Sequence, residues 1–190
     1  MAGPRIVYLH GFCSSPASWK ARMLFECLAT AGLGDRFACP LLSPVPLAAI
    51  ASVEALLASD EGPTVLVGSS LGGYYATWLA ERHALRAVVI NPVVMAPALL
   101  EGLLGTHSNF HSGERFTFTG EHAEQLRALD APLLTPARYL LLVETGDEVL
   151  DYRQAVERYA GCRQMILEGG DHSFTRFPEL VPQIIEFCGL

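Results

Sequence analysis

Positive charge is scarce in this sequence and is nowhere clustered. Of its 190 residues, 13 are Lys or Arg and 20 are Asp or Glu, which gives a formal net charge of −7. Nucleic-acid-binding proteins concentrate basic side chains on one face, and no such run is present. We therefore expect no nucleic-acid partner, and the acidic excess mainly favours solubility.

Long hydrophobic runs are also missing. The longest one, residues 87–100, is interrupted by Asn91, Pro92 and Pro97, and it falls short of the ~20 residues that a membrane span needs. Residues 1–5 lack a charged region followed by a long apolar stretch, so we expect no signal peptide. The five cysteines form no Cys-x-x-Cys pair, which favours reduced thiols and a cytoplasmic protein.

Motifs for a cofactor or a metal are lacking as well. No Gly-x-x-x-x-Gly-Lys-Ser/Thr occurs, and Gly32-x-Gly34 follows a predicted helix and has no third glycine. His107 and His111 have i, i+4 spacing, but the turn-forming residues around them disfavour a metal-binding helix. We expect neither a cofactor nor a metal.

Short apolar runs alternate along the chain with helical patterns. With 51% hydrophobic residues, the sequence suits a single domain over residues 1–190 with a substantial core. The alternation predicts an α/β fold, a predominantly parallel, doubly wound sheet with helices on both faces, whose strand carboxyl ends share one edge. Six strands are expected, at 5–10, 37–40, 64–68, 86–90, 139–143 and 164–167. Helices are expected at 19–30, 47–59, 71–83, 121–129, 151–159 and 177–187, with Ser18 and Asp151 as caps.

Residues 91–137 form the longest connection between predicted strands. They exceed the usual ~2–6 residues of an α/β loop and predict a small cap insertion. The part at 93–104 is apolar and is expected to be partly helical. Its apolar side chains could line an acyl pocket or simply pack on the core. They are Val93, Val94, Met95, Leu99 and Leu100.

Residues 68–72 read Gly-Ser-Ser-Leu-Gly, which is Gly-x-Ser-x-Gly with Ser70 at its centre. An apolar strand precedes this motif and a helical pattern follows it, the context of a nucleophile elbow in α/β hydrolases. The glycines leave room for the strand and the helix to approach at a strained serine. A flexible loop is the alternative, but the flanking pattern favours a nucleophilic Ser70.

A serine nucleophile needs a base, and the base needs an orienting acid. His172 follows the last predicted strand and Asp147 follows the strand before it, in the order Ser, Asp, His of α/β hydrolases. Four other carboxylates lie nearby. Glu144 ends a strand and could point away from the loop edge, Glu148 would point elsewhere, Asp151 suits a helix cap, and Asp171 is too close in sequence to orient His172. His10 more plausibly shapes its loop than acts as a base.

The tetrahedral intermediate of acyl transfer needs two backbone N–H donors. Leu71, directly after the serine, would supply one. The second is expected from the loop after the first strand, where Gly11 permits close approach and Phe12 is the candidate.

Four blocks of the chain together resemble the YqiA-type bacterial esterase family of small α/β hydrolases. They are His-Gly-Phe with Ser-Ser-Pro at 10–16, Gly-Ser-Ser-Leu-Gly-Gly-Tyr-Tyr-Ala-Thr-Trp-Leu at 68–79, Glu-Thr-Gly-Asp-Glu-Val-Leu-Asp-Tyr-Arg-Gln-Ala at 144–155, and Gly-Gly-Asp-His-Ser-Phe at 169–174. The resemblance implies a cytoplasmic esterase acting on short acyl esters or acyl thioesters, with a triad of Ser70, Asp147 and His172. Cys13 stands where asparagine is expected in relatives, which leaves its role open.

The resulting hypothesis is carboxylic ester hydrolysis through an acyl-enzyme. An acyl-CoA thioesterase would use the same triad and remains an alternative. A non-catalytic binding protein that kept the hydrolase fold is the alternative from another class.

Overall fold

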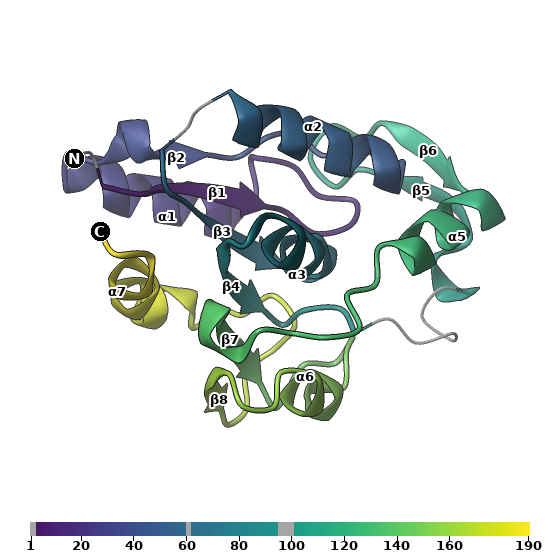
Figure 1. Cartoon of the computed structure of the whole chain (residues 1–190). Helices are drawn as coiled ribbons and strands as arrows, with labels where there is room; N and C mark the ends of the chain where they lie inside the picture. Colours follow the sequence, from purple (N-terminus) through teal and green to yellow (C-terminus); the bar gives the residue numbers. More distant parts are fainter. Residues whose placement is uncertain (1–2, 60–61, 95–100) are drawn as a thin grey trace.

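The computed structural model describes residues 3–59, 62–94 and 101–190. Its main sheet has six strands in the order β2-β1-β3-β4-β7-β8, and every neighbouring pair is parallel (Figure 1). The strands are β1 (Arg5–Leu9), β2 (Phe37–Ala38), β3 (Thr64–Ser69), β4 (Arg86–Ile90), β7 (Tyr139–Glu144) and β8 (Arg163–Leu167). All six predicted strands are present, and the predicted parallel sheet is confirmed.

Helices cover both faces of this sheet (Figure 1). On one face lie α1 (Trp19–Thr30) and α7 (Phe177–Cys188), which pack on Ile6 and Tyr8 of β1. The other face holds α2 (Pro46–Ala58), α3 (Leu71–His83) and α6 (Tyr152–Arg158), which pack with the alternate β1 residues Val7 and Leu9. Because successive side chains point to opposite faces, burial on both sides requires the continuous apolar runs seen in the sequence.

The connection from β4 to β7 contains a hairpin that the sequence did not predict. Its strands, β5 (Gly105–Ser108) and β6 (Arg115–Phe118), are antiparallel and are followed by α5 (Gly120–Ala128). Both strands are short and largely exposed, so they lack the apolar pattern that marks a buried strand. The expected helix at 121–129 is present as α5. The expectation for 93–104 concerns residues 95–100, which lie outside the described residues.

Two predicted helix caps have different outcomes. Asp151 caps α6, since its Oδ1 accepts a hydrogen bond from the Arg153 N–H at 3.0 Å. Ser18 occupies the cap position of α1, but its side chain makes no capping bond, so that prediction is wrong. Short 3₁₀ turns, η1 (Gly34–Arg36) and η2 (Pro136–Arg138), precede β2 and β7. Within the described segments, no helix combines the length and apolarity that crossing a membrane requires.

Candidate active site

Ser70 lies between the last residue of β3 and the first residue of α3, in a strained backbone conformation. Its φ of 56° and ψ of −122° are sparsely populated for residues other than glycine, at a typical cost of about 1–3 kcal/mol. Backbone hydrogen bonds hold it there. Its N–H donates to the Ile90 carbonyl at 3.0 Å, and its carbonyl accepts from Gly73 at 2.9 Å and from Val93 at 3.1 Å.

Two glycines of the motif are required by close backbone approach. A Cβ atom on Gly72 would overlap the carbonyl oxygen of Leu9 in β1, and one on Gly68 would overlap the Gly72 carbonyl. The obstacles are backbone atoms of packed elements, so they cannot move aside cheaply. The sharp turn that presents Ser70 therefore depends on these glycines.

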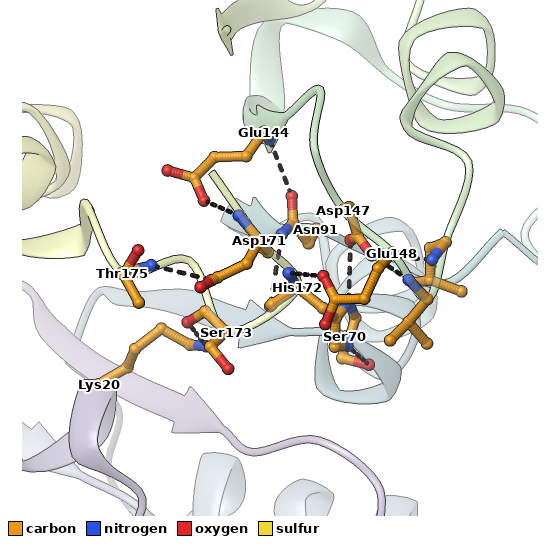
Figure 2. A network of polar contacts seen from close by, with 12 residues as sticks. Lys20, Ser70, Asn91, Glu144, Asp147, Glu148, Asp171, His172, Ser173 and Thr175 are labelled. Carbon is orange, nitrogen blue, oxygen red and sulfur yellow. Dashed lines mark hydrogen bonds and ion pairs between the residues drawn. The ribbon is translucent and has the colours of Figure 1, made fainter. Parts of the chain in front are cut away.

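The structure brings Ser70, His172 and Asp147 into one chain of hydrogen bonds (Figure 2). The Nε2 atom of His172 lies 3.2 Å from the Ser70 Oγ, and its Nδ1 lies 2.8 Å from the Asp147 Oδ2. The three residues follow β3, β7 and β8, so the carboxyl edge of the sheet gathers them as the strand order requires.

The carboxylate of Asp147 is placed to stay ionised. Its side chain is only 2% exposed, and this burial raises the pKa. Hydrogen bonds from His172 and from the N–H groups of Leu150 and Val149 outweigh that effect and hold the Asp147 pKa below its usual value. An ionised Asp147 accepts the Nδ1–H of His172, which leaves Nε2 free to accept the hydroxyl proton of Ser70.

The neighbouring carboxylates Glu148 and Asp171 accept backbone N–H groups of the histidine loop (residues 168–175) and do not contact the imidazole. Glu148, which was expected to point elsewhere, accepts the backbone N–H of His172 at 2.9 Å, and this bond lowers its pKa. Asp171 accepts the N–H of Thr175 at 3.3 Å. Among the described carboxylates, Asp147 is the one bonded to the His172 ring.

Glu144 and Asn91 hold the histidine loop through hydrogen bonds to its backbone, and the sequence reasoning missed both roles (Figure 2). Glu144 is fully buried, and its Oε2 accepts the Asp171 N–H at 2.9 Å, so the suggestion that it points away from the loop is wrong. Asn91 accepts the Glu144 N–H at 3.1 Å and donates to the Asp171 carbonyl at 3.1 Å. Glu144 is the last residue of the apolar strand β7, and Asn91 directly follows the apolar end of β4; a polar residue at such a position is the signal that could have identified them.

Lys20 of α1 also contacts this loop. It is 8% exposed, and its Nζ donates to the Ser173 carbonyl at 2.7 Å (Figure 2). Burial lowers the Lys20 pKa to about 8, against the opposing attraction of Asp171, Glu144 and Asp147. A lysine in a helix pattern is expected to be solvent-exposed, so nothing in the sequence indicates this buried ammonium.

The two candidate oxyanion donors flank Ser70. Gly11 passes directly beside it, because a Cβ atom built there would lie 3.3 Å from the Ser70 Cβ. Throughout the described part of the chain, neither the Phe12 N–H nor the Leu71 N–H has a hydrogen-bond acceptor. These free donors lie on the residue after Gly11 and on the first residue of α3, and their role as oxyanion donors stays a prediction.

The loop that carries Phe12 is held by the β5–β6 hairpin. The Phe12 ring makes edge contacts with His107, Phe116 and Phe118 at centroid distances of 4.9, 5.5 and 5.6 Å. The Phe110 N–H donates to the Cys13 carbonyl, and the Asn109 amide donates to the Ser14 carbonyl, both at 2.7 Å. The unpredicted hairpin therefore positions one of the two candidate donors.

His10 and Cys13 belong to the same loop. The His10 Nε2 accepts the Leu42 N–H at 3.0 Å and its Nδ1 lies 3.0 Å from the Gly11 carbonyl, so His10 shapes the loop as expected. Burial lowers its pKa, which agrees with a neutral ring bonded on both nitrogens. Cys13 is buried and has a positive φ of 56°.

Comparison with known proteins places this chain in a family. The model of the Uncharacterised protein family (UPF0227) matches residues 5–189. The chain belongs to the UPF0227 family. This match confirms the resemblance to YqiA-type proteins that the sequence motifs suggested.

Solved structures similar to this UPF0227 member have the α/β-hydrolase fold. Alpha/beta hydrolase domain-containing protein 10 from mouse is 19% identical with a TM-score of 0.72, over 100% of this chain and 92% of the other. A monoacylglycerol lipase from Paleococcus ferrophilus is 17% identical with a TM-score of 0.71, over 98% and 95%. Est1E from Butyrivibrio proteoclasticus is 14% identical with a TM-score of 0.72, over 97% and 86%. These similarities confirm the predicted fold.

Two hollows of this UPF0227 member share Gly11, Phe12 and Ser14 in their lining. The first, here called the Ser70 hollow, has a volume of about 550 Å³ and is also lined by Trp19, Lys20, Arg22, Ser70, His111 and His172. The second, here called the apolar hollow, has a volume of about 370 Å³ and is also lined by Leu41, Leu42, Pro44, Leu71, Tyr75 and Phe116.

Val93 and Val94 do not line either of these hollows. They line a separate one of about 340 Å³, together with Tyr74 and Leu129, and Ser70 does not border it. Neither valine therefore lines the two hollows beside Gly11 and Phe12, and Val93 packs against the core, the other expectation for these positions. The other apolar positions named with them, Met95, Leu99 and Leu100, lie outside the described residues.

Proposed function

We propose that this UPF0227 member is a carboxylic ester hydrolase that acts through Ser70, His172, Asp147 and an acyl-enzyme. The observation that carries this proposal is the hydrogen-bonded chain from Ser70 Oγ through His172 to a buried Asp147, built on a strained elbow. An aligned nucleophile, base and acid at the strand ends supply the groups that acyl transfer needs.

Each group has one task in the proposed reaction. The Ser70 Oγ attacks the ester carbonyl while the His172 Nε2 takes its proton, and the N–H groups of Phe12 and Leu71 donate to the resulting oxyanion. The carbonyl–oxygen bond then breaks, and His172 returns the proton to the leaving alcohol. Water repeats the sequence on the acyl-enzyme, which releases the acid and restores the Ser70 hydroxyl.

We assign the acyl group to the apolar hollow. Aliphatic and aromatic side chains make up more than half of its lining, which includes Leu71 and Phe12, the two proposed oxyanion donors. Its volume of about 370 Å³ supports short acyl chains, and residues 91–137 act in this proposal as a small cap on a single domain. Rates on esters from acetyl to palmitoyl should peak at short chains, and a rate that rises steadily to palmitoyl would contradict this assignment.

Labelling with a fluorophosphonate tests the proposal most directly, because the reagent traps an activated serine. The wild-type chain should be labelled on Ser70, and Ser70→Ala should not be labelled while Ser69→Ala is. Absence of labelling on a folded chain would instead support a non-catalytic binding protein.

The thioester alternative requires a second measurement. An oxygen ester and its thioester with the same acyl group should be compared by kcat/KM, because both reactions use the same three residues. We propose the oxygen ester as the better substrate and the cytoplasm as the place of action. A clear preference for the thioester would make the protein an acyl-CoA thioesterase.

A further inference from the structure

The Ser70 hollow is lined by basic side chains, although the protein as a whole is acidic. Lys20, Arg22 and His111 line it together with His172, and no Asp or Glu is among its described lining residues. The chain carries a net charge of −7, so this is a local reversal of sign. The apolar hollow differs, because its lining includes Glu114 but neither Lys nor Arg.

The chemistry of the proposed reaction decides which part of the substrate enters each hollow. A leaving group must receive a proton from His172, so it must lie within hydrogen-bond reach of that ring. His172 lines the Ser70 hollow and does not line the apolar hollow. In the proposed reaction, the leaving group therefore occupies the Ser70 hollow.

We propose that the leaving group of the natural substrate carries a negative charge, as a carboxylate or a phosphate, which Lys20 and Arg22 recognise. This inference rests on the proposed function and names its substrate class as an acyl ester or thioester of an anionic alcohol or thiol. The acyl part stays in the apolar hollow.

The two cations are available for an anion. Arg22 is exposed, and in the described segments no carboxylate lies within 4 Å of its guanidinium or of the Lys20 ammonium. Lys20 donates one hydrogen bond, to Ser173, and so keeps two of its three N–H groups. The acidic groups that act on Lys20 are Asp147, Asp171 and Glu144, and each of them already accepts hydrogen bonds from the histidine loop or its supports.

Recognition of a charged leaving group by Lys20 and Arg22 should appear as a preference for anionic over neutral substrates. An anion in the hollow gains attraction from Lys20 and Arg22, while a neutral leaving group of the same shape does not. The attraction weakens as salt screens it, more so at the exposed Arg22 than at the buried Lys20.

The test compares kcat/KM for matched pairs of substrates. In the oxygen-ester pair, 3-carboxyphenyl butyrate is set against its neutral isostere 3-carbamoylphenyl butyrate, each corrected for its alkaline hydrolysis rate. In the thioester pair, S-butyrylpantetheine 4′-phosphate is set against S-butyrylpantetheine. We expect the anionic member to be preferred by about threefold to tenfold in at least one pair, and the preference to fall in 0.5 M NaCl. The pair that shows it identifies the leaving group as an alcohol or a thiol.

Reversing the charge of Arg22 tests whether this side chain causes the preference for anionic substrates. Arg22→Glu should lower the anionic-to-neutral ratio by about threefold to tenfold. Arg163→Glu is the matched control, because Arg163 is exposed at the amino-terminal end of β8, on the opposite edge of the sheet, and should leave the ratio unchanged.

The outcomes separate this inference from the proposed function. Hydrolysis of the neutral esters without any anionic preference, or a preference that Arg22→Glu leaves intact, overturns the inference alone. If no ester or thioester is hydrolysed and fluorophosphonate labelling also fails, the proposed function is overturned, and the inference with it.

Discussion

The Ser70 Oγ and the His172 Nε2 lie 3.2 Å apart, yet the two loops that carry these residues are held by different forces. The elbow at Ser70 is fixed by backbone strain and by close packing at Gly68 and Gly72. The histidine loop is fixed by polar side chains from distant parts of the chain, namely Lys20, Asn91, Glu144 and Glu148 (Figure 2). The glycines that shape the elbow at Ser70 thus lie within five residues, 68–72, whereas the side chains that hold the histidine loop are spread from residue 20 to residue 148.

This difference predicts different responses to substitution. Steric packing against backbone fails abruptly when an atom is added, because the neighbouring elements cannot separate. A network of hydrogen bonds fails gradually, because each bond contributes about 1 kcal/mol and several remain when one is removed. The predictions below test the two loops in order of expected effect.

The largest effect is expected at Ser70, the proposed nucleophile. Ser70→Ala should lower the ester hydrolysis rate by about 10⁴- to 10⁶-fold with an unchanged melting temperature, because it removes the attacking oxygen and leaves the packing of the elbow intact. Steady-state rates with a short acyl ester provide the measurement. Ser69→Ala is the matched control, and a dead Ser69→Ala beside an active Ser70→Ala would refute the elbow assignment.

The acid that orients His172 comes next. Asp147→Asn should lower the rate by about 10⁴-fold, because the amide keeps the shape but loses the charge that stabilises the imidazolium. Asp151→Asn, four residues away, should mainly weaken the α6 cap, by about 1 kcal/mol or less. Measuring the rate and the melting temperature of both variants tests which aspartate orients His172. Loss of turnover in Asp151→Asn alone would identify Asp151 as the acid.

An added methyl group tests the steric support of the elbow. Gly72→Ala should lower the free energy of unfolding by about 3 kcal/mol or more, since its Cβ would overlap the Leu9 carbonyl of β1. Urea denaturation measures this loss. The matched control is Gly120→Ala in α5, where no atom lies within 4 Å of the added carbon, and it should be neutral or slightly stabilising.

Loss of a hydrogen-bonding side chain tests the polar support of the histidine loop. Asn91→Ala should cost about 2 kcal/mol of unfolding free energy, because the Glu144 N–H and the Asp171 carbonyl both lose their partner. Turnover should fall by about tenfold as the backbone of His172 becomes less well placed. A variant with normal stability and normal turnover would show that the other contacts hold this loop alone.

The smallest effect is a change of stability with pH at Lys20. Its folded pKa, about 8, lies below the usual 10.5, so between these values the unfolded chain binds more protons than the folded chain. This group therefore makes stability rise with pH in that window, by about 1 kcal/mol from pH 7 to pH 9. Urea denaturation of wild type and Lys20→Met at the two pH values should show a rise that the variant lacks, and equal changes would contradict it.

The sheet was predictable from sequence because its four central strands, β1, β3, β4 and β7, are buried on both faces. Continuous apolar runs such as 139–143 have no competing interpretation once helical patterns flank them. The elbow was predictable for a related reason, since the glycine pattern and its flanks are local to Ser70. The β5–β6 hairpin was not predictable, because only Phe116 and Phe118 mark its inner face and most of its residues face solvent.

The supports of the histidine loop could not be predicted because their partners are far apart in the chain. Glu144 was seen as one of several carboxylates near Asp147, but its bond to Asp171 crosses to the end of the next strand. Lys20 bonds Ser173 across 153 positions, and nothing in its local sequence distinguishes it from an exposed lysine. Sequence reasoning found the residues proposed for the chemistry and missed those that hold them in place.

The anchoring of Phe12 by the β5–β6 hairpin affects how a substrate would reach Ser70. If the hairpin swung outward, it would break the bonds from Phe110 and Asn109 and withdraw the aromatic wall around Phe12. Such a motion would also displace the loop that carries the Phe12 N–H, one of the two proposed oxyanion donors. We therefore expect the hairpin to stay in place during turnover and substrates to reach Ser70 through the Ser70 hollow and the apolar hollow.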